Sequence, residues 1–245
     1  MRGLLLTSVF AGSLVITAAA NVPLSFVLRH SGLAQNGVQW QQARGTIWHG
    51  QVTGMYVHGD AVGAVEGDFS FLRIVKGQPG HLLRWSGPYG HGSALAGVGA
   101  NSLRIRNGQA AITFDVARIS AVFPAQEVSS RLSNVAMDMD RDGCRTASGN
   151  VATDALASIS AAYGAKWPEL TGGLSCEQGK LFISVEGKAS DGTQISAKTS
   201  LEGGGQLELQ NVPDNQTNAL LLAGFTNEAG RYVYTQKSPN GETSQ

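Results

Sequence analysis

The sequence predicts a mainly β protein, with a transmembrane helix at the amino end followed by an antiparallel β-meander, curved or sandwich-like, and a few short helices. The chain carries 32 glycines among 245 residues and only 15% charged residues, a balance that favours short strands joined by tight turns. After residue 30, apolar and polar residues alternate with a period of two, as in strands that bury one face. One long apolar run precedes that pattern.

The apolar run Gly3–Leu28 contains no charged residue and is bounded by Arg2 and Arg29. About 20 such residues suffice to cross a bilayer as a helix, so the run predicts a single membrane span. A cleaved signal peptide is the alternative, because Arg2, an apolar stretch and the small residues Ala18–Ala20 supply its parts. Apolar sequence that continues past Ala20 favours an anchor that is retained.

Short alternating segments predict the strands of the meander, starting with "TIWHGQVTGMYVHGD". In this segment Ile47 and His49 fall on one face of a strand and Trp48 on the other. Two pairs, Asn107-Gly108 and Asp191-Gly192, predict hairpin turns because both residues of each pair tolerate positive φ. The remaining segments are "AVEGDFSFLRIV", "HLLRWSG", "NSLRIRNGQAAITFDV", "LSNVAMDMD", "KLFISVEGKA", "TQISAKTSLE" and "GQLELQNV".

Helical patterns are few, and the carboxyl end is polar. We predict short helices within Phe123–Leu132, Thr153–Gly164 and Gln216–Phe225. The final "SPNGETSQ" predicts a disordered tail. We therefore divide the chain into a membrane anchor with a short cytoplasmic end (1–30), one β-rich domain (31–237) and the tail (238–245).

The two cysteines, Cys144 and Cys176, lie 32 positions apart and beside glycines. A single pair in a chain with an export signal predicts a disulfide formed in an oxidising compartment. Two buried free thiols are the alternative. Zinc is disfavoured, since two cysteines without CxxC spacing or a nearby histidine do not fill four ligand positions.

Charge and motifs give no sign of a reactive centre. The 18 basic and 18 acidic residues cancel, so no overall field favours nucleic acid. None of the five histidines lies in a metal-binding pattern such as H-E-x-x-H. A site of Ser93, His58 and Asp60 can be drawn, but the G-x-S-x-G of a nucleophile elbow is missing. We predict no catalytic residue, no cofactor and no small-molecule substrate.

The acidic run "MDMDRDG" places Asp138, Asp140 and Asp142 at alternating positions, and therefore on one face of a strand. Calcium is conceivable there. However, the glutamate that completes a calcium loop is missing, so the run predicts a solvated strand edge. We predict no metal ligand in the chain.

The motif G-T-hydrophobic-W-x-G, formed by Gly45, Thr46, Trp48 and Gly50 around Ile47, follows the apolar run closely. Together with the β-rich region and the cysteine segment "LTGGLSCEQGKLFISVEGK", it resembles the type II secretion system protein N family. The resemblance extends from the anchor to about Tyr234. It implies a single-pass inner-membrane protein of Gram-negative bacteria with a periplasmic β domain, which supports export of folded proteins across the outer membrane without catalysis.

The same resemblance implies the partners: inner-membrane lipid and other type II secretion components, either single-span inner-membrane subunits or the outer-membrane channel. A more distant similarity to β-rich envelope proteins that handle lipid leaves an alternative, a β groove that binds lipid or an apolar ligand. Within the motif we expect structural roles. Gly45 and Gly50 permit close backbone approach, and Trp48 anchors the first strand in the core.

Overall fold

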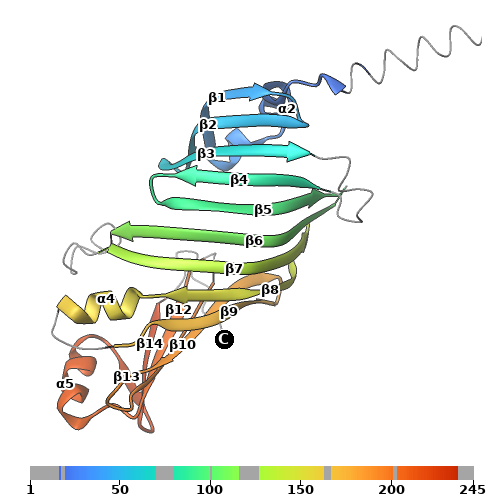
Figure 1. The fold of residues 1–245 in the computed structure, drawn as a ribbon. Helices are drawn as coiled ribbons and strands as arrows, with labels where there is room; N and C mark the ends of the chain where they lie inside the picture. Colours follow the sequence, from blue (N-terminus) through green and yellow to red (C-terminus); the bar gives the residue numbers. More distant parts are fainter. Residues whose placement is uncertain are drawn as a thin grey trace, which may run out of the picture. The chain divides into compact units, whose positions relative to one another are not determined.

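The computed structural model describes residues 17, 20–69, 80–99, 101–115, 127–162, 167–200 and 203–236. The chain forms two compact units, Met1–Gly97 and Val98–Gln245, whose elements are labelled in Figure 1. Within each unit the strands pair antiparallel. The predicted mainly β class with a few short helices is therefore confirmed, while the division into residues 1–30, 31–237 and 238–245 stays a prediction.

The first unit is a meander preceded by short helices. Each strand pairs with the next along the chain, and two rows of residues show how its faces differ. Gln51, Glu66 and Arg84 lie side by side on one face, and Val52, Val65 and Trp85 lie side by side on the other. The elements are α2 (Leu24–His30), the 3-10 helix η1 (Leu33–Asn36), β1 (Val38–Gly45), β2 (His49–Val57), β3 (Asp60–Phe69), β4 (His81–Gly87) and β5 (Gly90–Val98).

The second unit is also built from antiparallel strands, some of them longer, and it contains two helices. The strands follow one another in the sheet until β12, where β14 inserts between β12 and β13. The elements are β6 (Ser102–Asp115), β7 (Glu127–Asp140), β8 (Gly143–Thr153), α4 (Ala155–Ala162), β9 (Leu170–Glu177), β10 (Lys180–Lys188), β11 (Gln194–Ser200), β12 (Gly205–Gln210), α5 (Asp214–Leu222), β13 (Thr226–Glu228) and β14 (Arg231–Gln236).

The main core of the second unit lies where the helices meet the sheet. Its buried members come from four strands and from α5, and Leu156 of α4 packs against them. Figure 1 shows both helices beside the end of this sheet. The helices thus cover part of one sheet face, over β9, β11, β12 and β14. The buried members are Leu170, Ile195, Leu209, Leu220 and Tyr232.

One of the two predicted turns is confirmed and the other is wrong. Asp191-Gly192 joins β10 to β11, and the Asp191 carboxylate accepts a hydrogen bond from the Thr193 amide at 2.9 Å. Asn107-Gly108, in contrast, lies inside β6, where the pairing with β7 shifts register. Asn107 does have positive φ (51°), and so does Asn134 on β7 (54°). The pair therefore forms a bulge within a long strand rather than a turn.

Two of the three predicted helices are confirmed. Thr153–Gly164 contains α4, and Gln216–Phe225 overlaps α5. The helix expected over Phe123–Leu132 is wrong for residues 127–132, which form the start of β7, while residues 123–126 lie outside the described part of the chain. Val128 is fully buried there, because on a strand it points to one face with the polar residues beside it pointing away.

The apolar run Gly3–Leu28 does not form one continuous helix. Thr17 and Ala20 are helical, and the Thr17 carbonyl accepts hydrogen bonds from the backbone and side-chain amides of Asn21, at 3.2 and 2.8 Å. Pro23 is extended, with ψ at 134°, and α2 begins only after it. The single span expected through Leu28 is therefore wrong beyond Asn21.

Most of the apolar run, and the predicted tail at 238–245, lie outside the described residues. Among the helices that the structure does describe, none has the length and apolar character needed to traverse a bilayer. The membrane span stays a prediction.

Candidate functional site

The motif Gly45–Gly50 forms the turn between β1 and β2. Gly45 pairs with Gly50, and the Thr46 amide donates to the His49 carbonyl oxygen at 2.9 Å. The Thr46 hydroxyl accepts hydrogen bonds from the amides of Trp48 and His49, both at 3.3 Å. The continuous strand expected through this stretch is wrong, because these local bonds close a tight turn. Gly45 has φ of 83°, and a Cβ there would collide with the His49 carbonyl oxygen.

Trp48 at this turn is half-buried rather than in the core. Its ring meets Phe69 edge-on, with ring centroids 5.1 Å apart, and its carbonyl accepts the Phe69 amide at 2.7 Å. The Phe69 ring lies 5.0 Å from that of His81, which donates from Nε2 to the Ile47 carbonyl oxygen at 3.0 Å. The turn is therefore fixed to the end of β3 and the start of β4.

The turn also holds the segment that follows the apolar run. The Ile47 amide donates to the Val22 carbonyl oxygen at 3.1 Å, and Pro23 forms an isolated bridge with Thr46. A Cβ at Gly50 would lie 2.6 Å from Cδ2 of Leu24 and 2.7 Å from the Thr46 carbonyl oxygen. Glycine at position 50 thus leaves room for Leu24, a reason that the sequence alone did not reveal.

His49 belongs to an exposed charged group on the polar sheet face. Its Nδ1 donates to Asp68 at 3.0 Å, and Arg84 donates to the other carboxylate oxygen at 2.9 Å. The hydrogen bond from His49, with further help from Arg84, holds the pKa of Asp68 below its ordinary value. The carboxylate is therefore paired with two basic neighbours, an arrangement that suits a surface ion pair rather than a reactive base.

The structure does not bring Ser93, His58 and Asp60 together. Ser93 lies opposite Arg84, which in turn lies opposite Glu66 on β3. Asp60 lies six positions before Glu66 on β3, and six strand positions separate the two residues by about 20 Å. His58 lies in the turn beside Asp60. The hydrolase site that can be drawn from the sequence has no geometric basis.

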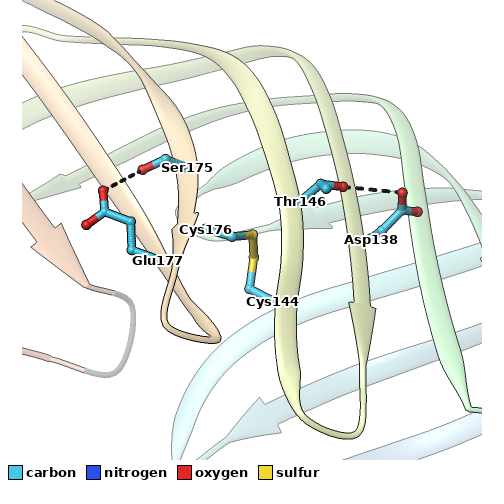
Figure 2. Close-up of a disulfide and its surroundings, with 6 residues drawn as sticks. All are labelled: Asp138, Cys144, Thr146, Ser175, Cys176 and Glu177. Carbon is cyan, nitrogen blue, oxygen red and sulfur yellow. Dashed lines mark hydrogen bonds between the residues drawn. A yellow bond between two sulfur atoms is a disulfide. The ribbon is translucent and has the colours of Figure 1, made fainter.

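Cys144 and Cys176 form a disulfide between β8 and β9, with Cα atoms 5.5 Å apart (Figure 2). The turn between β7 and β8 lies against the turn between β9 and β10, since the Cys144 amide donates to the Gly179 carbonyl oxygen at 2.7 Å. Gly143 has φ of 111°, and any Cβ there would strike that same oxygen. The glycines that flank the cysteines therefore permit the approach that the disulfide closes.

A bulge beside the disulfide separates polar from apolar residues. Thr146 lies opposite Asp138 and Cys144 lies opposite Met139, so the register of β8 shifts between them. Because successive residues of β7 face opposite sides, Cys144 shares the face of Met139. On the other face Thr146 donates to Asp138 at 3.3 Å, as Figure 2 shows.

Asp138 and Asp140 lie on β7, an interior strand of the sheet, and are paired with arginines, whereas Asp142 lies in the turn between β7 and β8. The strand edge expected to carry all three aspartates on one face is therefore wrong. Arg106 donates to Asp138 at 3.2 Å, Arg104 lies 3.6 Å from the same carboxylate, and Arg145 lies 3.4 Å from Asp140. The Arg106 hydrogen bond lowers the pKa of Asp138. Within the described residues no group of three or more acidic, histidine or cysteine side chains is placed to hold a metal ion.

An open hollow of about 540 Å³ lies over β9–β12 in the second unit, and another of about 560 Å³ adjoins it, since both include Glu186 and Ser196. Strand register places Glu186, Ser196 and Glu208 in one row across three strands. Glu208 accepts a hydrogen bond from Gln210 at 2.7 Å. Apolar Val185, Ile195 and Ala197 also line the hollows, and the other polar side chains around them are Thr171, Ser184, Lys188, Gln194, Lys198 and Gln206.

A family model described as type II secretion system (T2SS), protein N matches residues 36–235. The match takes in the described strands of both units, except the last residue of β14, together with the turn motif and both cysteines. Neither a curated protein nor a solved structure is significantly similar to the chain.

Proposed function

The chain belongs to the type II secretion system protein N family, and we propose that it serves there as a non-catalytic, single-pass inner-membrane subunit with most of its mass in the periplasm. The uncharged stretch Gly3–Ala20 supports the anchor, because it is long enough for a short membrane helix. The Cys144–Cys176 disulfide supports an oxidising compartment. The proposed task is to hold other secretion components in place during export of folded proteins across the outer membrane.

The observation that carries this proposal is β1, an edge strand of the sheet, although α2 and η1 contact it from the same unit. Among the described strands, β1 has a neighbour on one side only, namely β2. Its sequence "VQWQQARG" contains one charged residue and no proline, although charge and proline commonly protect exposed edges. The sheet order ends at the three-residue β13, which offers little backbone. We infer that a partner strand adds to β1 through main-chain hydrogen bonds.

We do not assign the lipid-carrier alternative. An acyl chain needs a continuous apolar groove, whereas the hollows over β9–β12 mix apolar side chains such as Val185 with carboxylates and hydroxyls such as Glu186 and Ser196. The scaffold function fits the described surfaces better, because paired charges and open strand edges suit contact with protein.

A photo-crosslinking amino acid at Gln39 or Gln41, both exposed on β1, is expected to capture another type II secretion component in secreting cells. The matched control is Arg131, which is exposed on β7 between two neighbouring strands. We expect adducts from β1 and none from Arg131, detected by mass spectrometry of the crosslinked bands. Adducts with secretion components from Arg131 alone, or from no position, would contradict the proposed role of the edge.

His49→Ala is expected to leave secretion at the wild-type level. The side chains of His49 and Asp68 are 70% and 42% exposed, and water replaces such an ion pair at little cost. Secretion of a folded exoprotein into the medium is the measurement, with His49→Gln as the control that keeps hydrogen-bonding capacity. A strong defect in the alanine variant, with normal protein levels, would assign His49 a direct role.

A further inference from the structure

We propose that the outward face of α2, formed by Phe26 and Val27, lies in the interfacial layer of the lipid bilayer and is held there by the Gly45–Gly50 turn. The partner is the membrane surface itself. This inference rests on the proposed function in one respect, since it takes the apolar run before Asn21 as a retained membrane anchor.

The exposure of α2 follows the pattern of a helix at an apolar surface. Phe26 is 58% and Val27 39% exposed, while Leu24 and Leu28, one helical turn apart, are half-buried on the opposite side. The exposed Phe26 and Val27 therefore face outward as an apolar pair that the described residues leave uncovered.

Basic and aromatic groups stand together at the end of α2. Arg29 and His30 form its last turn, and no acidic residue lies in its sequence LSFVLRH. The Phe26 ring lies 4.4 Å from the His30 ring, and His30 Nδ1 donates to the Phe26 carbonyl oxygen at 2.8 Å. Aromatic rings and basic side chains are the residues that occupy the headgroup layer of membranes.

Chain length keeps α2 close to the membrane. Only Asn21, Val22 and Pro23 separate the helical Ala20 from α2, and three extended residues span about 10 Å at most. The polar layer on each side of a bilayer is itself about 5–8 Å thick. If the helix that includes Ala20 ends at the hydrocarbon boundary, α2 starts within or directly beside the headgroup layer.

The turn motif prevents α2 from swinging away from the sheet. The Ile47 amide holds the Val22 carbonyl, Thr46 bridges Pro23, and Gly50 receives the Leu24 side chain. These contacts precede or begin α2, so they fix its position on the Gly45–Gly50 turn. The motif end of the first unit is thus the end that faces the lipid, and the opposite end, at the β2–β3 turn, points away.

The test uses the full chain reconstituted into vesicles of phosphatidylethanolamine and phosphatidylglycerol. Mass spectrometry of the intact protein first verifies that residues 1–20 are retained and that the Cys144–Cys176 disulfide is formed. An environment-sensitive NBD label is then attached to Val27→Cys, a position that leaves Phe26 unchanged. Leu222→Cys, an exposed apolar position that is 90% accessible in the second unit, is the matched control. Asp60→Cys, at the first residue of β3 beside the β2–β3 turn, is the second control.

We expect vesicles with brominated acyl chains to quench the label at position 27 and to leave the labels at 60 and 222 unquenched. Adding Phe26→Asp to the Val27→Cys chain should abolish the quenching. An aqueous emission spectrum at position 27, or equal quenching at all three positions, would overturn the proposal. If position 27 is quenched but β1 crosslinks to no secretion component, the membrane contact of α2 stands and the proposed function fails.

Discussion

Replacing Cys144 and Cys176 together with alanine is expected to lower the free energy of unfolding of the second unit by about 3–4 kcal/mol. The bond closes a loop with a sequence separation of 32 residues. In the chain-entropy model, such a closure removes conformations from the unfolded chain and leaves the folded unit little changed. Alanine is preferred to serine because Cys144 is only 6% exposed, so a hydroxyl there would add a separate penalty.

The position of this disulfide explains why its effect should be large. The loop that it closes includes α4 and the whole connection from β8 to β9. Core residues Leu170, Ile195 and Leu209 all lie after that connection, whereas β6 and β7 lie before it. The disulfide thus shortens the loop that must close before the strands after this connection pair with the strands before it.

Hydrogen exchange at increasing urea concentration, followed in peptides from β8 and β9, is the appropriate measurement because it reports the second unit separately from the first. Reductant applied to the wild-type chain should reproduce the loss, and reductant applied to the double-alanine chain should change nothing. Equal protection in oxidised and reduced wild-type protein would show that the disulfide does not stabilise the fold.

Local sequence signals predicted the fold class and several elements because they arise from local physics. Alternation of apolar and polar residues decides which face of a strand is buried, and Asp191-Gly192 forms its turn through a bond within the turn itself. The cysteine pair was likewise predictable, since the chain has two cysteines after an apolar run that predicts export, and both facts limit the choices. Such features depend on few distant contacts.

Other features depend on partners that are far away in the sequence. Asn107-Gly108 has the composition of a hairpin turn, but the bulge it forms is set by β7, where Asn134 adopts a similar positive φ. The apolar pattern predicted a single element over Gly3–Leu28. The contacts of Val22 and Leu24 with the turn motif instead place the last part of this run in the first unit. Only tertiary structure reveals these pairings.

The turn motif shows the same limit at the candidate site. Alternation assigned Trp48 to a strand face in the core, but the Thr46 hydroxyl closes a turn before it. Trp48 packs instead against Phe69, which lies at the end of a strand later in the chain. The residue types of the motif were informative, and their three-dimensional roles required the contacts with Phe69 and Leu24.

Trp48→Ala is expected to destabilise the first unit by about 2–3 kcal/mol, less than the 3–5 kcal/mol typical of a fully buried large aromatic, because the ring is only half-buried. Part of the loss comes from the edge-on contact with Phe69, since such pairs contribute about 0.5–1.5 kcal/mol beyond their burial. Hydrogen exchange of β2 and β3 peptides in urea measures the effect, with Trp48→Phe as the control that keeps an aromatic ring.

A double-mutant cycle separates the Phe69 contact from simple loss of volume. Trp48→Ala and Phe69→Ala together should cost less than the sum of the two single changes, because each single change already removes the shared contact. His49→Ala, at the neighbouring position of the same turn, should leave protection of these strands unchanged. Additive losses would place the stabilising effect of Trp48 outside the ring pair, in the turn and in the segment Val22–Leu24 that the turn holds.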